Sequence, residues 1–248
     1  MWKSYVDNVD KYIVRGIVML YNKKIFEAKF IKRPNRFNAE VELNNENITV
    51  HVPNTGRCKE LLIPGVKVLL REELNPTRKT RYDLVAVYKG EKLISIDSQI
   101  PNKVVKEALL NKSVDNLCGY SQILTEKTYG NSRFDFKLTD DNDIEYYLEV
   151  KGVTLESEGY SKFPDAPTER GTKHIMELIE VKKEGKGAGI LFLIQMEDVK
   201  SFTPNIETDP KFSNALKLAY QSGVDIMAYS CKVYKEGIEL YKKVKVII

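Results

Sequence analysis

The sequence contains few of the residues that build disulfide frameworks, zinc clusters or histidine-based active sites. Its 248 residues include only three cysteines and two histidines. Cys58, Cys118 and Cys231 are scattered and lack CxxC spacing, which argues against a disulfide framework and a zinc site and is typical of a reducing cytoplasm. His51 and His174 leave a Ser-His-Asp site possible by count, but the chain has neither a GxSxG nor an HExxH motif.

Long hydrophobic runs are also missing. The longest uninterrupted apolar stretch, at 190–194, is far shorter than the ~20 residues that a membrane-spanning helix needs. The first residues carry charges at Lys3, Asp7, Asp10, Lys11 and Arg15 and show no apolar core of a signal peptide. With 42% hydrophobic and 30% charged residues, the chain can bury a core. We therefore expect a soluble, cytoplasmic protein of one or two domains that makes no contact with a membrane.

The charges are nearly balanced overall, with a formal net charge of +4, but they are unevenly distributed. Residues 1–85 carry 16 Lys and Arg against 10 Asp and Glu, whereas residues 86–248 carry 23 against 25. A positive N-terminal third is consistent with a surface that follows phosphates. It is equally consistent with solvated strands that carry lysines for solubility.

Residues 1–100 show the two-residue period of half-buried strands. Apolar side chains alternate with polar ones around 26–30, 37–43 and 48–52, and further strands are predicted at 66–71, 82–88 and 92–96. Turn-forming residues separate them at 44–47 and 89–91. Several short strands without an intervening helical period predict a small antiparallel barrel. We favour an OB-like barrel, although an SH3-like barrel would show a similar pattern.

Residues 101–248 change to a mixed pattern that predicts a second domain. Helices are expected at 102–110 and 168–183, and a third begins at Pro210 with Asp209 as its cap and Gly223 beyond its end. Strands are expected as a hairpin over 133–152, at 189–195, at 224–229 and in a final hairpin over 232–248. This order predicts an α/β domain built on a mixed sheet.

The hairpin over 133–152 carries the residues that are best suited to catalysis. Its turn at 140–143 sets a register in which Asp135 lies opposite Glu149, and strand alternation places Lys151 on the same face as Glu149. Two opposed carboxylates repel unless a divalent cation lies between them, and oxygen ligands of this kind favour Mg²⁺ or Mn²⁺. Lys151 could then orient water or stabilise charge on a phosphate. The alternative is a solvated ladder in which the lysine merely pairs with the carboxylates.

The predicted helix over 168–183 has a polar face near this hairpin. Helical spacing groups Arg170, Lys173, His174 and Glu177 on that face. Its basic residues, Arg170 and Lys173, suit a DNA backbone, but the face could also be only the solvent side of an amphipathic helix. His174 is not expected to bind a metal, because no second histidine is available nearby.

Basic residues of the barrel form the second candidate binding region. They cluster at predicted strand ends and loops, where nucleic acid usually contacts OB-like barrels. We expect them to contact phosphates with little reading of base sequence. They are Arg33, Arg36, Arg57, Arg78, Lys79 and Arg81.

Six motifs in a fixed order resemble the sugar fermentation stimulation protein A family. The resemblance begins at about residue 25 and reaches the C-terminus. The motifs are RPNRF at 33–37, HVPNTGR at 51–57, NPTRK at 75–79, SRFDF at 132–136, EVK at 149–151 and FPDA at 163–166.

The resemblance implies an N-terminal OB-like domain, a C-terminal domain like the PD-(D/E)XK nucleases, and DNA binding without strong sequence preference. It assigns Asp135 and Glu149 as metal ligands and Lys151 as the catalytic lysine. It also suggests that Glu107, on the helix before the hairpin, is the acidic residue that the first core helix of such nucleases often supplies.

Two functions remain open at this point. The protein is either a DNA-binding protein whose nuclease-like domain serves as a scaffold, or a Mg²⁺-dependent nuclease that acts on DNA. DNA binding is common to both and is our leading prediction. A carbohydrate-binding module, which the family's name suggests, has little support because no aromatic platform stands out.

Overall fold

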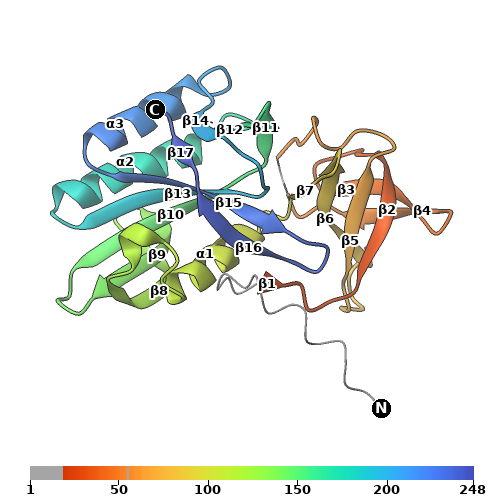
Figure 1. Ribbon diagram of the computed structural model, residues 1–248, viewed down its shortest axis with the longest axis horizontal. Helices are drawn as coiled ribbons and strands as arrows, with labels where there is room; N and C mark the ends of the chain where they lie inside the picture. The colour runs from red at the N-terminus through yellow and green to blue at the C-terminus, as the bar shows by residue number, and fades with distance from the viewer. Residues whose placement is uncertain (1–18, 55) are drawn as a thin grey trace, which may run out of the picture.

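The computed structural model describes residues 19–54 and 56–248. Figure 1 shows a small barrel, coloured orange to yellow, beside a larger sheet that carries the α-helices. The first unit is a small closed barrel and the second is a mixed sheet with helices, as the sequence predicts. No helix of these described residues is long and apolar enough to span a membrane.

Six strands form the barrel sheet in the order β4-β3-β2-β5-β6-β7. A further parallel pairing between β4 and β6, at His51 and Asp83, closes the barrel. Asn44 and Asn45 adopt positive φ angles of 54° and 66° in the tight turn between β3 and β4, a conformation that asparagine tolerates well. The strands are β2 (Ile25–Lys32), β3 (Asn38–Leu43), β4 (Glu46–His51), β5 (Lys67–Glu72), β6 (Tyr82–Lys89) and β7 (Lys92–Ser95).

The larger sheet has seven strands in the order β1-β16-β15-β13-β10-β9-β8. Its centre, β10-β13-β15, is parallel, and its remaining pairs are antiparallel. The strands are β1 (Met19–Leu20), β8 (Tyr120–Tyr129), β9 (Ser132–Asp140), β10 (Glu145–Val153), β13 (Gly187–Ile194), β15 (Asp225–Val233) and β16 (Gly237–Lys243). Because β1 pairs with β16, part of the predicted segment 1–100 belongs to this sheet, and residues 1–18 of that segment lie outside the described residues.

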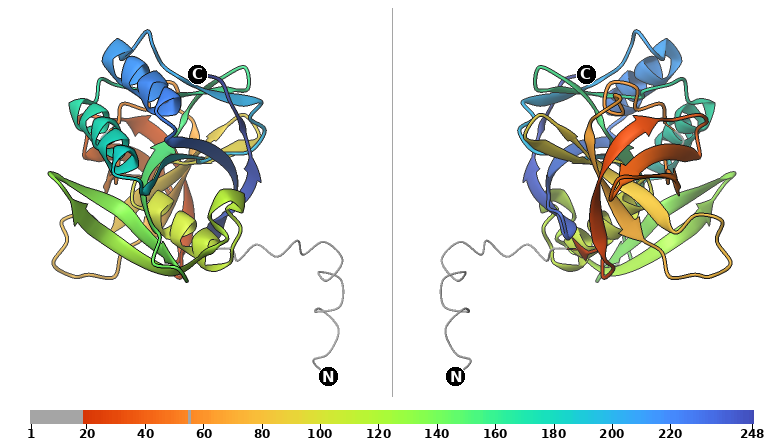
Figure 2. Two further views of the ribbon diagram at one scale, coloured as in Figure 1. Left: turned by 90° about the vertical axis from the view of Figure 1, so that its left-hand side faces the viewer. Right: turned by 90° about the vertical axis from the view of Figure 1, so that its right-hand side faces the viewer.

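Helices cover both faces of the larger sheet. Helices α2 (Glu169–Lys183) and α3 (Pro210–Gln221) pack together on one face, and α1 (Ile100–Leu110) lies on the other. Figure 2 shows α2 and α3 side by side. The Asp209 side chain accepts a hydrogen bond from the Phe212 amide at 2.9 Å, which confirms the predicted cap of α3.

Several elements do not appear in the sequence prediction. Strand β8 has a largely exposed pattern on both faces, so its sequence lacks the alternation that marks a half-buried strand. A four-stranded sheet beside the main one is built from short pieces that carry too few residues to show a period. Three of them are β11 (Leu155–Ser157), β12 (Tyr160–Phe163) and β14 (Ser201–Pro204). The fourth, β17 (Lys245–Val246), lies within the predicted final hairpin over 232–248 but pairs with β14. A 3₁₀ turn, η1, spans Asp115–Leu117.

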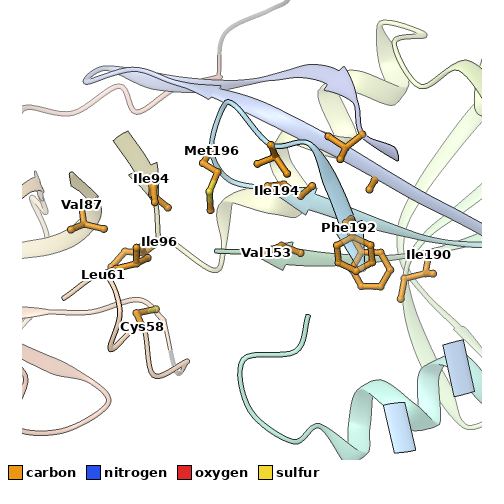
Figure 3. Packing of buried hydrophobic residues seen from close by; sticks show 14 of the residues in the cluster. Cys58, Leu61, Val87, Ile94, Ile96, Val153, Ile190, Phe192, Ile194 and Met196 are labelled. Atoms are coloured by element: carbon orange, nitrogen blue, oxygen red, sulfur yellow. The ribbon is translucent and has the colours of Figure 1, made fainter. Parts of the chain in front are cut away.

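The barrel and the second unit share one hydrophobic core. Figure 3 shows Leu61 and Ile96 of the barrel side facing Val153, Ile194 and Met196 of the second unit. All five side chains are at most 2% exposed. This continuous packing fixes the orientation of the two units, because separating them would expose the apolar surface to water.

Candidate active-site cleft

The predicted hairpin register is confirmed. β9 pairs with β10 through Tyr146↔Leu138 and Leu148↔Phe136, and continuing this register places Asp135 opposite Glu149. The regular ladder stops one pair earlier, because a side-chain oxygen of Asp135 takes the hydrogen bond of the next amide. Asp135 Oδ2 lies 2.8 Å from the nitrogen of Val150. The carboxylate is therefore held against β10 rather than pointing freely into solvent.

Helix α1 supplies the second contact of Asp135. The Asn102 side-chain nitrogen donates to Asp135 Oδ1 at 2.7 Å. Pro101, at the start of the same helix, packs close to Gly152 on β10, where an added Cβ would lie 2.8 Å from Pro101 Cγ and 2.5 Å from Gln195 Oε1. Glycine at 152 thus permits the close approach of α1 to β10.

Glu149 is deeply buried and uses only one of its carboxylate oxygens. Lys151 Nζ donates to Oε1 at 2.5 Å, and His174 Nδ1 lies 2.6 Å from the same oxygen. The other oxygen, Oε2, is buried and has no hydrogen-bond partner among the described residues. An unpartnered carboxylate oxygen in a buried site is costly unless a cation or another donor satisfies it.

The side chain of His174 does not face solvent. Its ring is buried, with 5% exposure, and contacts Glu149 on one edge and Phe134 across an edge-to-face pair. Helix α2 begins at the Thr168 cap, whose side chain accepts from the Gly171 amide at 3.0 Å. The start of the α2 face that carries Arg170 and His174 therefore turns toward the carboxylates, and the alternative of a purely solvent-facing side does not hold for His174.

The two carboxylates are shifted in opposite directions. Burial, together with the negative charge of Glu149, raises the pKa of Asp135. Burial would raise the pKa of Glu149 as well, but the hydrogen bonds and charges of His174 and Lys151 outweigh it and hold that pKa below its usual value. Glu149 is therefore the firmly ionised member of the pair, and Asp135 is the member that takes up a proton more readily.

A cleft of about 260 Å³ lies over these residues. Its walls come from the start of α1, from β9 and β10, and from the start of α2. The lining includes Asn102, Asp135, Glu149, Lys151, Thr168 and Arg170. Three predicted site residues from the hairpin and one from α2 therefore meet in one depression.

Two other predicted residues lie away from the cleft lining. Glu107 is half-buried on α1, and burial raises its pKa. Asn102 is the residue through which α1 reaches Asp135, and Glu107 lies five positions further along the helix, so the two side chains leave α1 in different directions. Lys173 donates to the carbonyl of Asn131 at 2.9 Å and thereby ties α2 to the turn between β8 and β9.

Three predicted DNA contacts in the barrel are engaged within the protein. The terminal nitrogens of Arg33 donate to four backbone carbonyls, at residues 36, 54, 56 and 57. Arg78 pairs with Asp83, and Arg81 donates to Glu72 at 2.9 Å through Nε. These guanidinium groups organise loops and strand ends of the barrel.

The other three basic residues remain exposed. Arg36, Arg57 and Lys79 form no ion pair with a described residue. Arg36 and Arg57 line a groove of about 410 Å³, which also contains Lys32 and Lys59 and has apolar walls. We call this depression the barrel groove. The sequence prediction did not include Lys32 and Lys59, although both lie within the basic N-terminal third.

A closed OB-like barrel joined to a mixed sheet, with two carboxylates and a lysine on neighbouring strands, defines a protein with a restriction-endonuclease-like fold. The chain belongs to the sugar fermentation stimulation protein family. Residues 99–237 match the model described as "Sugar fermentation stimulation protein RE domain", and residues 31–96 match the "SfsA N-terminal OB domain".

Close relatives span nearly the whole chain. A sugar fermentation stimulation protein homolog of Clostridium tetani is 66% identical over 230 residues, which cover 93% of this chain and 100% of the relative. A homolog from Clostridium perfringens is 62% identical over the same length. The solved structure of Pyrococcus furiosus SfsA in complex with Ca²⁺ is 30% identical, covers 93% of this chain and 99% of its own, and superimposes with a TM-score of 0.85.

Proposed function

We propose that this protein binds DNA and hydrolyses its phosphodiester bonds with a divalent cation at the cleft between α1, β10 and α2. The observation that carries the proposal is the buried, unpartnered Oε2 of Glu149 beside Asp135 and Lys151. A solvated ladder in which the lysine merely pairs with the carboxylates would leave no buried carboxylate oxygen without a partner. The Ca²⁺ in the structure of the Pyrococcus furiosus relative supports a divalent cation in this family.

The donor set fits Mg²⁺ or Mn²⁺. Asp135 and Glu149 would hold the ion, because carboxylate oxygens are the ligands that these hard cations prefer. The described residues include no cluster of three or more His, Cys, Asp or Glu side chains, so the other ligands would be backbone oxygen, water and phosphate. When bound, the cation supplies Lewis-acid polarisation of the phosphate and a more acidic water.

The chain's own residues have separate tasks. Lys151, only 18% exposed at its side chain, places a positive charge at the cleft, where it stabilises negative charge that builds up on the phosphate or orients the attacking water. Arg170 lines the same cleft and can hold a neighbouring phosphate. His174 and Lys151 together fix the orientation of Glu149 Oε1.

In this proposal, the segments before and after about residue 100 have different functions. The barrel of the first segment holds DNA through exposed basic residues, and the segment 101–248 carries the chemistry. Arg36, Arg57 and Lys79 remain candidate phosphate contacts, together with the groove residues Lys32 and Lys59. The contacts are expected to be largely independent of sequence, because they are made by basic side chains with phosphate rather than with base edges.

A cleavage assay tests the proposal. Supercoiled plasmid and labelled oligonucleotides are incubated with the protein in Mg²⁺, in Mn²⁺ and in EDTA. We expect cleavage with either metal and none in EDTA. If the parent protein binds DNA but leaves it intact with both metals, hydrolysis is excluded, and the second candidate function, DNA binding on a nuclease-like scaffold, stands instead.

A further inference from the structure

Three depressions follow one another across the molecule. The barrel groove shares Gly56 with a smaller cavity of about 190 Å³ between the two units. That cavity, which we call the interdomain passage, shares Ser98 and Gly152 with the active-site cleft. The three depressions are therefore neighbours, in a row between the exposed basic side chains of the barrel and the carboxylates Asp135 and Glu149.

Positive charge accompanies this row of depressions along its length. Arg36, Arg57 and Lys59 lie at the barrel groove, and Arg170 lies at the cleft. Between them, Lys162 of β12 lines the interdomain passage and forms no ion pair with a described residue. Unpaired cations spaced along a groove are the electrostatic pattern that follows a phosphate backbone.

The passage is narrow, and its walls are held together. Gln195 Nε2 of the second unit donates to the carbonyls of Ser95 and Asp97 at 3.1 and 3.2 Å. On the opposite side, the Arg57 amide donates to Asp165 Oδ2 at 3.1 Å, and an added Cβ on Gly56 would lie 2.7 Å from that oxygen. The shared core prevents the units from moving apart. A cavity of this size is too small for a base pair.

An exposed aromatic ring beside the barrel groove offers a surface on which a base can stack. Phe30, Leu62 and Pro64 give the groove apolar walls, although Phe30 and Leu62 are themselves buried. Phe37, next to the groove residue Arg36, is 52% exposed, and the guanidinium of Arg36 lies 5.4 Å from its ring centroid. Aromatic and apolar surfaces beside basic residues bind unpaired bases, whereas a duplex keeps its bases stacked inside.

We propose that the substrate is single-stranded nucleic acid, or a single-stranded end, which runs from the barrel groove through the interdomain passage into the cleft. This inference rests on the proposed function and specifies its substrate class. Lys162 contacts a phosphate inside the passage. Asp165 is the carboxylate of the passage, and it is turned toward the Arg57 amide rather than toward Lys162 in the contacts described.

The test compares binding of four labelled probes by the full chain. They are a single-stranded DNA 20-mer, the same sequence as RNA, the blunt DNA duplex, and a duplex with a single-stranded tail. Parent protein is compared with Lys162→Glu, with the milder Lys162→Gln, and with the matched control Lys217→Glu on the exposed surface of α3. Lys162 makes no hydrogen bond or ion pair with a described side chain, so these variants should fold, which thermal melts verify.

We expect single strands and the tailed duplex to bind about tenfold or more tightly than the blunt duplex. Lys162→Glu should weaken single-strand binding about tenfold, Lys162→Gln should weaken it less, and Lys217→Glu should remain within about twofold of the parent. The DNA and RNA arms identify which single strand is preferred.

Equal or tighter binding of the blunt duplex would overturn the route, as would identical affinities of Lys162→Glu and Lys217→Glu. If blunt duplex is cut in a metal-dependent way while Lys162→Glu has no effect, the route fails and the proposed function stands. If no probe binds even at low salt, both fail.

Discussion

The Nδ1 atom of His174 lies 2.6 Å from Oε1 of Glu149, the same oxygen that accepts the hydrogen bond of Lys151. Two groups thus hold one carboxylate oxygen and leave the buried Oε2 without a partner among the described residues. Residues that orient a metal-binding carboxylate typically contribute 10–100-fold (about 1–3 kcal/mol) to metal affinity or turnover. The orientation of Glu149 is therefore part of the site that we propose.

Replacing His174 tests this positioning role. His174→Ala should raise the Mn²⁺ concentration needed for half-maximal cleavage by about tenfold or more and lower kcat, while the Kd for DNA stays unchanged. His174→Gln, whose amide can still donate, should recover part of the loss. A purely structural role predicts lower thermal stability with an unchanged metal requirement, and that result would refute the positioning role.

Asp135→Asn tests the metal-binding pair. The pKa of Asp135 is raised by burial and by the charge of Glu149, so removing its negative charge should not destabilise the metal-free protein. Mn²⁺ should raise the Tm of the parent by mass action, and this rise should vanish in Asp135→Asn. Asp143→Asn, the same change at an exposed turn position, is the control and should keep the rise. A Tm rise that survives in Asp135→Asn would place the cation elsewhere.

The register of this pair could be predicted, and the surroundings of the pair could not. A turn at 140–143 and a two-residue period suffice to align Asp135 with Glu149 and to put Lys151 on the same face, because both are local properties of a hairpin. The burial of His174 depends on which strand lies beneath the first turn of α2. That is a long-range contact which a helical period does not specify.

In the barrel, too, sequence patterns predict local structure but not long-range contacts. Alternating apolar residues predict its strands, because half-buried strands have a period of two. The charge of Arg33 is equally visible in the sequence, but three of the four carbonyls that surround it belong to a loop more than 20 residues away. Sequence alone therefore counts Arg33, Arg78 and Arg81 as phosphate contacts, whereas the structure uses their donors internally.

This difference predicts two kinds of arginine variant. Arg57→Ala combined with Lys59→Ala should weaken single-strand binding and reduce the slope of log K against log salt by about 1.4, with little change in stability. Arg33→Ala should lower the free energy of unfolding, because it leaves the part-buried carbonyls of Asn54 and Gly56 without this donor. Fluorescence anisotropy across salt concentrations and urea denaturation measure the two effects. An unchanged salt slope in the double variant would exclude the barrel groove as a phosphate-binding surface.

Asp83 makes the stability of the barrel depend on pH. It is 3% exposed, and although burial alone would raise its pKa, hydrogen bonds from Arg78 and His51 and the charges of Arg78 and Arg71 lower it. Because the folded pKa is below the unfolded value, the stabilisation is present above about pH 4 and is lost as the pH falls through the folded value.

Asp83→Asn should therefore lower the free energy of unfolding at pH 7 by about 2–3 kcal/mol, since Arg71 keeps its bonds to Glu73 and Asp97. The difference between parent and variant should shrink at pH 3. Urea denaturation at the two pH values provides the measurement, and a difference that grows on acidification would contradict the lowered pKa.

The most direct test of phosphodiester hydrolysis at the cleft is to measure DNA affinity and single-turnover cleavage in the same preparations of parent and Lys151→Ala protein. Lys151→Ala removes the positive charge next to Glu149 but keeps both carboxylates, Arg170 and the barrel groove. We predict a cleavage rate about 10²–10⁴-fold lower with Mn²⁺ and a Kd within about threefold of the parent. Equal cleavage rates in the two proteins would contradict hydrolysis at this site.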